Sequence, residues 1–79
     1  MSNTSLILYT TEGCHLCELA EQLLVQLGVE HEFVLERRDI AEDETLVERY
    51  GIRIPVVKNR DTEVEIDWPF HAEELLGLF

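Results

Sequence analysis

Residues 13–17 read GCHLC, from Gly13 to Cys17, and contain both cysteines of the 79-residue chain. The residues before them, Leu6-Ile7-Leu8-Tyr9, form a short apolar run that is typical of a strand covered on both faces. From Cys14 onward, apolar side chains recur at helical spacing as far as Gly28, which is placed to end a helix. The cysteine pair therefore lies where a strand pattern changes into an amphipathic helix.

The rest of the chain predicts one α/β domain over residues 1–79 with the element order β-α-β-α-β-β-α. We expect further strands over residues 30–35, 55–58 and 64–66. Turn residues at 59–61 predict that the last two strands form an antiparallel hairpin. The first β-α-β unit is short enough for a right-handed crossover between parallel strands.

Two more helices are expected. Acidic and capping residues over 39–44 suit the start of the second helix, which ends at Gly51. Residues 68–79 form the last helix, with Pro69 in its first turn, where the missing N–H costs least. The buried side of the second helix is predicted to consist of Leu46, Val47 and Tyr50.

Composition limits the classes of partner. The formal net charge of −11 disfavours nucleic acid and anionic membranes, and it suits either a solubilising surface or a docking surface for a basic partner. The longest apolar run is four residues, too short to span a membrane, and the N-terminus lacks a secretory signal pattern. We therefore expect a cytoplasmic protein, in which a Cys-x-x-Cys pair is more often catalytic or metal-binding than structural.

The spacing of the cysteines gives the two sulfur atoms different roles. A disulfide this short closes too small a loop to stabilise the fold much, so a redox role is favoured. Cys14 lies at or just before the first helical turn, where free amides and the helix dipole stabilise a thiolate. Cys17, three residues later on the same face, is within reach of a disulfide but less exposed. We expect Cys14 to attack and Cys17 to resolve.

The two residues between the cysteines are candidate contacts for a substrate. His15 either tunes the thiolate as an imidazolium or simply faces solvent. Leu16 either packs inward or offers an apolar contact. Zinc would need two ligands beyond the cysteine pair, and His31 and His71 do not form a ligand-like pair, so no metal site is expected.

Three motifs together resemble the thioredoxin superfamily, and within it the small glutaredoxin-like proteins. They are Tyr9-Thr10, the GCHLC stretch and Arg53-Ile54-Pro55, and the resemblance extends over essentially all 79 residues. It implies a three-layer fold in which a four-stranded mixed sheet is flanked by three helices. It also implies a cis Ile54–Pro55 bond whose loop lies against the cysteine pair and presents backbone groups to a mixed disulfide.

The chain departs from typical glutaredoxins around the groove that binds glutathione. Thr11 stands where relatives carry lysine, and His15-Leu16 replaces Pro-Tyr. Asp67 and Trp68 begin the segment that replaces a Gly-Gly-x-Asp turn, so bulk there would narrow the groove. Trp68 is either a residue of the core and helix entry or a platform for a ligand.

Positive charge is expected at other places near the groove. Arg53 would lie near Cys14 in the family geometry and could pair with the thiolate or with a substrate carboxylate. Arg37 and Arg38 would either hold the glycine carboxylate of glutathione or form ordinary surface ion pairs.

These features predict a monomeric thiol–disulfide oxidoreductase that reduces protein or glutathione mixed disulfides. Cys14 and Cys17 are its catalytic residues, and its substrate-binding residues are His15, Leu16, Arg53, Ile54, Pro55, Asp67 and Trp68. No bound cofactor is expected, and glutathione is a candidate reductant. The alternative is a non-catalytic module that keeps the fold and binds a protein partner beside Cys14.

Overall fold

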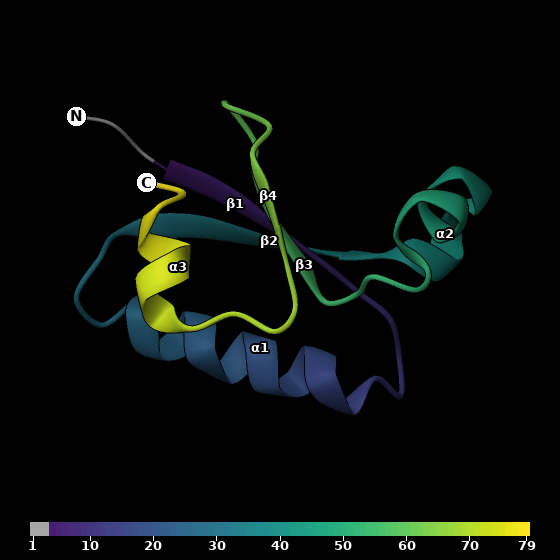
Figure 1. The fold of residues 1–79 in the computed structure, drawn as a ribbon, viewed down its shortest axis with the longest axis horizontal. Helices are drawn as coiled ribbons and strands as arrows, with labels where there is room; N and C mark the ends of the chain where they lie inside the picture. The colour runs from purple at the N-terminus through teal and green to yellow at the C-terminus, as the bar shows by residue number, and fades with distance from the viewer. Residues whose placement is uncertain (1–3) are drawn as a thin grey trace.

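The computed structural model describes residues 4–79, and Figure 1 shows their arrangement. The element order is the predicted one, with a short 3₁₀ helix, η1, added before the second helix. The elements are β1 (Thr4–Thr10), α1 (His15–Leu27), β2 (Phe33–Asp39), η1 (Ile40–Glu42), α2 (Glu44–Tyr50), β3 (Val56–Asn59), β4 (Glu65–Asp67) and α3 (Ala72–Leu76).

The four strands form one mixed sheet in the order β2-β1-β3-β4. β1 runs parallel to β2 along its whole length, which places α1 in the crossover between them. β3 runs antiparallel to β1, with Val56 opposite Tyr9, and β4 runs antiparallel to β3. The expected hairpin of the last two strands and the mixed sheet are both confirmed.

Alternating side chains on β1 divide the core into two layers, as a strand covered on both faces requires. Leu6 and Leu8 are buried in the larger cluster, which also contains Leu24 of α1 and Leu75 of α3. Ile7 and Tyr9 face the opposite side, where a smaller cluster includes Ile40 and Tyr50. Helices therefore pack on both faces of the sheet, and α1 and α3 lie together, apart from α2 (Figure 1). The predicted three-layer architecture is confirmed.

Several boundaries differ from the prediction because local caps decide them. β2 begins at Phe33 rather than at residue 30, since the amides of Glu30 and His31 still bond to the Leu27 carbonyl at the end of α1. The acidic stretch at 39–44 holds two caps: Asp39 accepts from the Ala41 amide, and Asp43 accepts from the Thr45 amide. Because Asp43 caps a new helix, α2 begins at Glu44 and is separate from the 3₁₀ helix η1 that follows the first cap.

The expectation that Pro69 sits in the first turn of the last helix is wrong. α3 begins at Ala72, because His71 and Glu74 form a capping box in which Glu74 accepts from the His71 amide at 2.8 Å. Residues 68–70 instead form a non-helical connection in which Phe70 is buried. In the second helix Tyr50 is buried, but Val47 is 46% exposed and does not belong to the predicted buried side.

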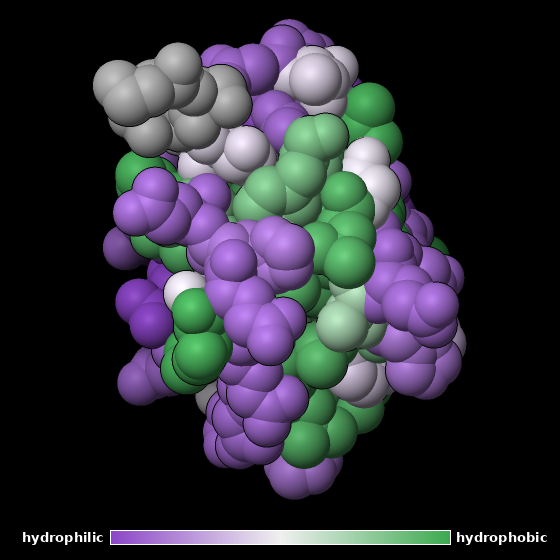
Figure 2. All heavy atoms as spheres, turned by 90° about the vertical axis from the view of Figure 1, so that its left-hand side faces the viewer, coloured by the Kyte–Doolittle hydropathy of each residue, from purple (hydrophilic) through white to green (hydrophobic). Residues whose placement is uncertain are grey.

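The C-terminus packs against the start of β2. The Phe79 ring makes an edge contact with Phe33 at 5.5 Å and a tilted contact with His31 at 5.7 Å. Figure 2 shows this end of the molecule, where apolar side chains form a band between hydrophilic ones. Within residues 4–79, no helix has the length and apolar character needed to cross a membrane.

Candidate functional site

Both cysteines lie at the start of α1, where the chain turns back from the end of β1. Gly13 has φ of +77°, a left-handed conformation that glycine adopts without steric cost, and it sets the direction of this turn. Cys14 is the N-cap residue, and its Sγ accepts a hydrogen bond from the Cys17 amide at 3.1 Å. The two cysteines form a disulfide with their Cα atoms 5.2 Å apart. The predicted position of Cys14 at the helix start is confirmed.

The two sulfur-bearing residues differ in exposure. Cys14 is partly exposed, whereas Cys17 is only 3% exposed, as the sequence predicts. Between them, His15 and Leu16 are both exposed, and Leu16 retains 43% of its surface in solvent. Of the two alternatives for Leu16, the structure therefore favours an apolar contact offered to solvent over inward packing.

The loop before β3 lies at the same end of the sheet as the cysteines. Tyr9 pairs with Val56, so Pro55 stands next to the end of β1, from which the chain passes to Cys14 (Figure 1). The Ile54–Pro55 peptide bond is cis, and the Pro55 side chain is buried. The Pro55 carbonyl accepts from the Trp68 amide at 3.1 Å, which brings two predicted substrate-binding residues together.

Arg53 faces β4 and is held there by acidic partners. Its guanidinium bonds to both carboxylate oxygens of Asp67, and one terminal nitrogen also bonds to Glu65 at 2.9 Å. It also lies 5.1 Å from the centre of the Tyr50 ring. Arg53 and Asp67, both predicted to bind substrate, are thus joined in one ion pair, and contact of either with a substrate stays a prediction.

These contacts perturb three acidic groups. Burial, followed by the hydrogen bond to Glu65, raises the pKa of Tyr50 well above its ordinary value. The hydrogen bonds from Arg53 lower the pKa of Asp67. For Glu65, burial alone would raise the pKa, but hydrogen bonds from Tyr50 and Arg53 outweigh it and the net shift is downward. Glu65 and Asp67 therefore keep their charges beside Arg53.

The arginines at the end of β2 form ordinary ion pairs. Arg37 pairs with Glu21 of α1 at 2.5 Å, and Arg38 pairs with Glu36. Glu36 also accepts from Arg60 at 2.9 Å. This confirms the surface-pairing alternative for Arg37 and Arg38.

The Trp68 side chain packs against the hydrophobic core. It is partly buried, packs against the larger core cluster and makes an edge contact with the Phe70 ring at 5.1 Å. These contacts favour the core alternative over an open platform for a ligand.

Two structural features near the site were not predicted. Tyr9 and Tyr50 stack with ring centres 4.0 Å apart, and the Tyr50 hydroxyl bonds to Glu65. The only signal in the sequence was the expectation that Tyr50 is buried. Its polar partner, fifteen positions away, depends on the pairing of β3 with β4.

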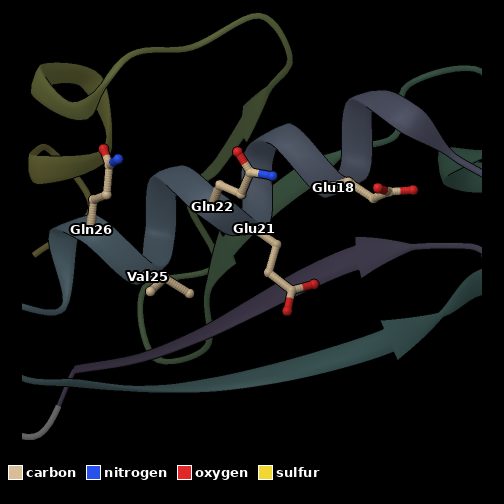
Figure 3. Close-up of a pocket in the computed structure, with 5 residues that line it drawn as sticks. All are labelled: Glu18, Glu21, Gln22, Val25 and Gln26. Atoms are coloured by element: carbon tan, nitrogen blue, oxygen red, sulfur yellow. The ribbon is translucent and has the colours of Figure 1, made fainter.

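A shallow groove runs along the outer side of α1. It has a volume of about 500 Å³ and is lined by residues of that helix alone: Glu18, Glu21, Gln22, Val25 and Gln26 (Figure 3). Within residues 4–79, no group of three or more His, Cys, Asp or Glu side chains is arranged to hold a metal ion.

The sheet order, the helix layers and a Cys-x-x-Cys pair at the start of α1 define a protein of the thioredoxin-like class. The chain belongs to the glutaredoxin-like domain family (DUF836), whose model matches residues 5–78. A comparison with curated proteins gives no significant match.

Solved structures agree with this assignment. The chain is similar to protein XcR50 from X. campestris, with 35% identity, a TM-score of 0.77 and 91% of each chain covered. It is also similar to protein Ne2328 from Nitrosomonas europaea, with 31% identity and a TM-score of 0.83, covering 98% of this chain and 91% of that one. A malarial protein shares only the fold, with 16% identity and a TM-score of 0.70 over 98% and 93% of the two chains.

Proposed function

We propose that the chain is a thiol–disulfide oxidoreductase in which Cys14 attacks a substrate disulfide and Cys17 resolves the product. The observation that carries this proposal is the Cys14–Cys17 disulfide at the N-terminus of α1, where the Cys17 amide donates to Cys14 Sγ at 3.1 Å. Once the disulfide is reduced, that amide and the helix dipole stabilise a thiolate at Cys14.

The reaction has two exchange steps. The Cys14 thiolate attacks one sulfur of the substrate disulfide, forms a mixed disulfide and releases the other sulfur as a thiolate. The Cys17 thiolate then attacks Cys14 Sγ, closes the intramolecular disulfide and releases the second substrate sulfur. Two electrons pass to the substrate, and the protons of the two cysteines end on the released thiols. A thiol reductant, for which glutathione is one candidate, then reduces the protein again.

The difference in exposure supports this division of roles. A substrate in solution reaches Cys14, which is partly exposed, more readily than Cys17, which is 3% exposed. Cys17 in turn is held where it attacks Cys14. The proposal includes action as a monomer in the cytoplasm, where a Cys-x-x-Cys pair is kept reducible, and it requires no resident cofactor.

The neighbouring loops would form the substrate groove. His15 and Leu16 lie between the cysteines, and the segment from Arg53 to Pro55 follows α2 at the same end of the sheet. The third part of the groove is formed by Asp67 and Trp68. The Arg53–Asp67 ion pair and the hydrogen bond from the Trp68 amide to the Pro55 carbonyl hold it in place.

Single-cysteine variants test the assignment. Cys17→Ser should attack a disulfide substrate and remain as a covalent mixed disulfide, visible as a mass increase that a reductant removes. Cys14→Ser should form no such adduct and turn over no substrate. Full turnover by Cys14→Ser would show that the assignment of roles is wrong.

The second candidate is a non-catalytic module that binds a protein beside Cys14. It is favoured by the engagement of Arg53 with Glu65 and Asp67 and by the bulky segment in place of the expected glycines. Equilibration in thiol/disulfide buffers, followed by alkylation and mass measurement, separates the two candidates. Reversible oxidation near a cytosolic poise of about −220 to −320 mV supports the enzyme, and a pair that stays reduced throughout supports the module.

A further inference from the structure

The surface around Cys14 presents carboxylates and apolar side chains to solvent. Glu12 and Glu18 are exposed, the first two residues before Cys14 and the second one helical turn after it, with its amide bonded to the Cys14 carbonyl at 3.3 Å. Leu16 is 43% exposed, and Ile52, in the loop that leads to Pro55, is fully exposed. An incoming molecule therefore meets carboxylates and an apolar side chain beside the cysteines, and a second apolar side chain on the loop before Pro55.

Three of the arginines at this end are already paired with carboxylates, while Arg49 of α2 is exposed and, within residues 4–79, its guanidinium contacts only the Tyr50 ring. Arg53 is shared between Asp67 and Glu65, at 2.9 Å from each. Arg37 pairs with Glu21, and Arg38 pairs with Glu36. To bind at Arg53, Arg37 or Arg38, an anion with two carboxylates, such as glutathione, would have to displace an internal partner. The Trp68 amide, in the segment that replaces the expected glycines, already donates to Pro55.

The groove on α1 extends away from Cys14, and its acidic character comes from Glu18, because its second carboxylate, Glu21, is paired with Arg37. Residues 14, 18, 22 and 25 fall on one face of a helix, so the groove lies on the same face as Cys14 and begins one helical turn after it. Figure 3 shows the Glu18 carboxylate pointing toward the N-terminal end of α1, with Val25 further along the groove. A lysine or arginine laid here would place its aliphatic stem on apolar surface and its charge near Glu18.

We propose that the preferred substrate is a protein disulfide flanked by basic residues, and that its chain lies along α1 from Cys14 toward Val25. This inference rests on the proposed oxidoreductase function and specifies its substrate class. Complementary charge mainly raises the rate of encounter, so the preference should appear in the second-order rate constant and weaken as salt screens it.

Matched disulfide peptides provide the test. Two peptides with the same disulfide, one flanked by lysines and one by glutamates, are reduced by the reduced protein at low and high salt. We expect the lysine-flanked peptide to react about tenfold faster at low ionic strength, with the difference falling to about twofold or less in concentrated salt. Equal rates at low salt, or a faster glutamate-flanked peptide, would overturn the inference.

Charge-reversal variants locate the preference on the protein. Glu18→Lys and Glu12→Lys should each reduce the lysine-to-glutamate rate ratio severalfold. The ratio is the correct readout, because a change in Cys14 reactivity alters both rates equally and cancels. Glu30→Lys is the control: it makes the same change in net charge in the exposed turn after α1, at the other end of that helix, and should leave the ratio unchanged. An equal change of the ratio in all three variants would show that the preference comes from net charge and not from the surface around Cys14.

A neutral disulfide separates failure of this inference from failure of the proposed function. Reduction of 2,2′-dithiodipyridine at a rate that depends on Cys14, with no preference between the peptides, retains the oxidoreductase and rejects the basic substrate. No Cys14-dependent reduction of any of the three disulfides rejects both.

Discussion

The guanidinium of Arg53 forms a two-point ion pair with Asp67, with both N–O distances 2.9 Å. Arg53 lies in the loop that leads to Pro55, and Asp67 is the last residue of β4. The pair therefore fastens the loop at the cysteine end of the molecule to the edge of the sheet. Tyr50, stacked on Tyr9, lies beneath the same guanidinium and extends the contact to β1.

Replacing Arg53 by lysine should lower the free energy of unfolding by about 1 kcal/mol. A lysine keeps the charge but cannot make the two parallel bonds to Asp67 and a third to Glu65. The effect stays modest because the Arg53 side chain is 33% exposed. Urea unfolding followed by circular dichroism measures it.

Arg37→Lys is the matched control for this variant. Arg37 also pairs with a glutamate, but its side chain is 55% exposed, so the change should be within about 0.5 kcal/mol. Equal losses in the two variants would mean that the contacts of Arg53 with β4 contribute no more than a surface pair.

Acid should weaken the fold partly through Asp67. The pKa of this carboxyl is lowered from its ordinary value of 3.8 in the folded chain, chiefly by its hydrogen bonds with Arg53. The stability it contributes is therefore fully present above about pH 4–5 and is lost as the pH falls through the folded pKa. Glu65, whose pKa is also lowered, acts in the same direction.

Comparison with Asp67→Asn isolates this contribution. The net charge is −11, so protonation of other carboxyls on acidification also relieves repulsion. The pH dependence of the wild-type free energy of unfolding therefore combines this effect with the contribution of Asp67. The variant should be less stable at pH 7 by up to about 1 kcal/mol, and the difference should shrink toward pH 2.5. Urea midpoints across this range measure it, and a difference independent of pH would contradict the assignment.

The parts of the fold that were predicted correctly depend on local signals. The apolar run ending at Tyr9 and the helical spacing after Cys14 each predict one element, and together they place Cys14 at the start of the helix. The pairing of Arg53 with Asp67 joins residues fourteen positions apart and requires the β3–β4 register, which the sequence pattern does not determine. At Pro69 two local signals competed: proline is common in a first helical turn, but the capping box that starts two residues later decides the boundary.

Asn59 is a buried polar residue that connects the β3–β4 turn to the C-terminus. It is 5% exposed, its amide nitrogen donates to the Leu78 carbonyl, and its side-chain oxygen accepts from the Asp61 amide at 2.8 Å. Asn59→Ala should reduce the free energy of unfolding by about 2 kcal/mol, because it leaves both partners without their bonds. Urea unfolding again provides the measurement.

Asp61→Ala controls for a change in the same turn. The Asp61 side chain is exposed, and the bond to Asn59 uses its backbone amide, which alanine retains. We expect a change within about 0.5 kcal/mol. If Asn59→Ala were as mild, the hydrogen bonds of Asn59 would not hold the turn and the C-terminus together.

Gly13→Ala should destabilise the chain through its backbone conformation alone. Gly13 has φ of +77°, and a Cβ atom built there meets nothing within 4 Å, so the cost is that of a left-handed alanine, about 1–2 kcal/mol. Gly13→Asn should cost less, because asparagine tolerates this conformation better.

Gly28→Ala is the control for this prediction. Gly28 has φ of −65° and the added Cβ makes only ordinary contacts, so the variant should be neutral or stabilised by about 0.5 kcal/mol. Urea unfolding of the three oxidised variants tests the order, and equal stability of Gly13→Ala and Gly28→Ala would show that the turn before Cys14 does not require a left-handed residue.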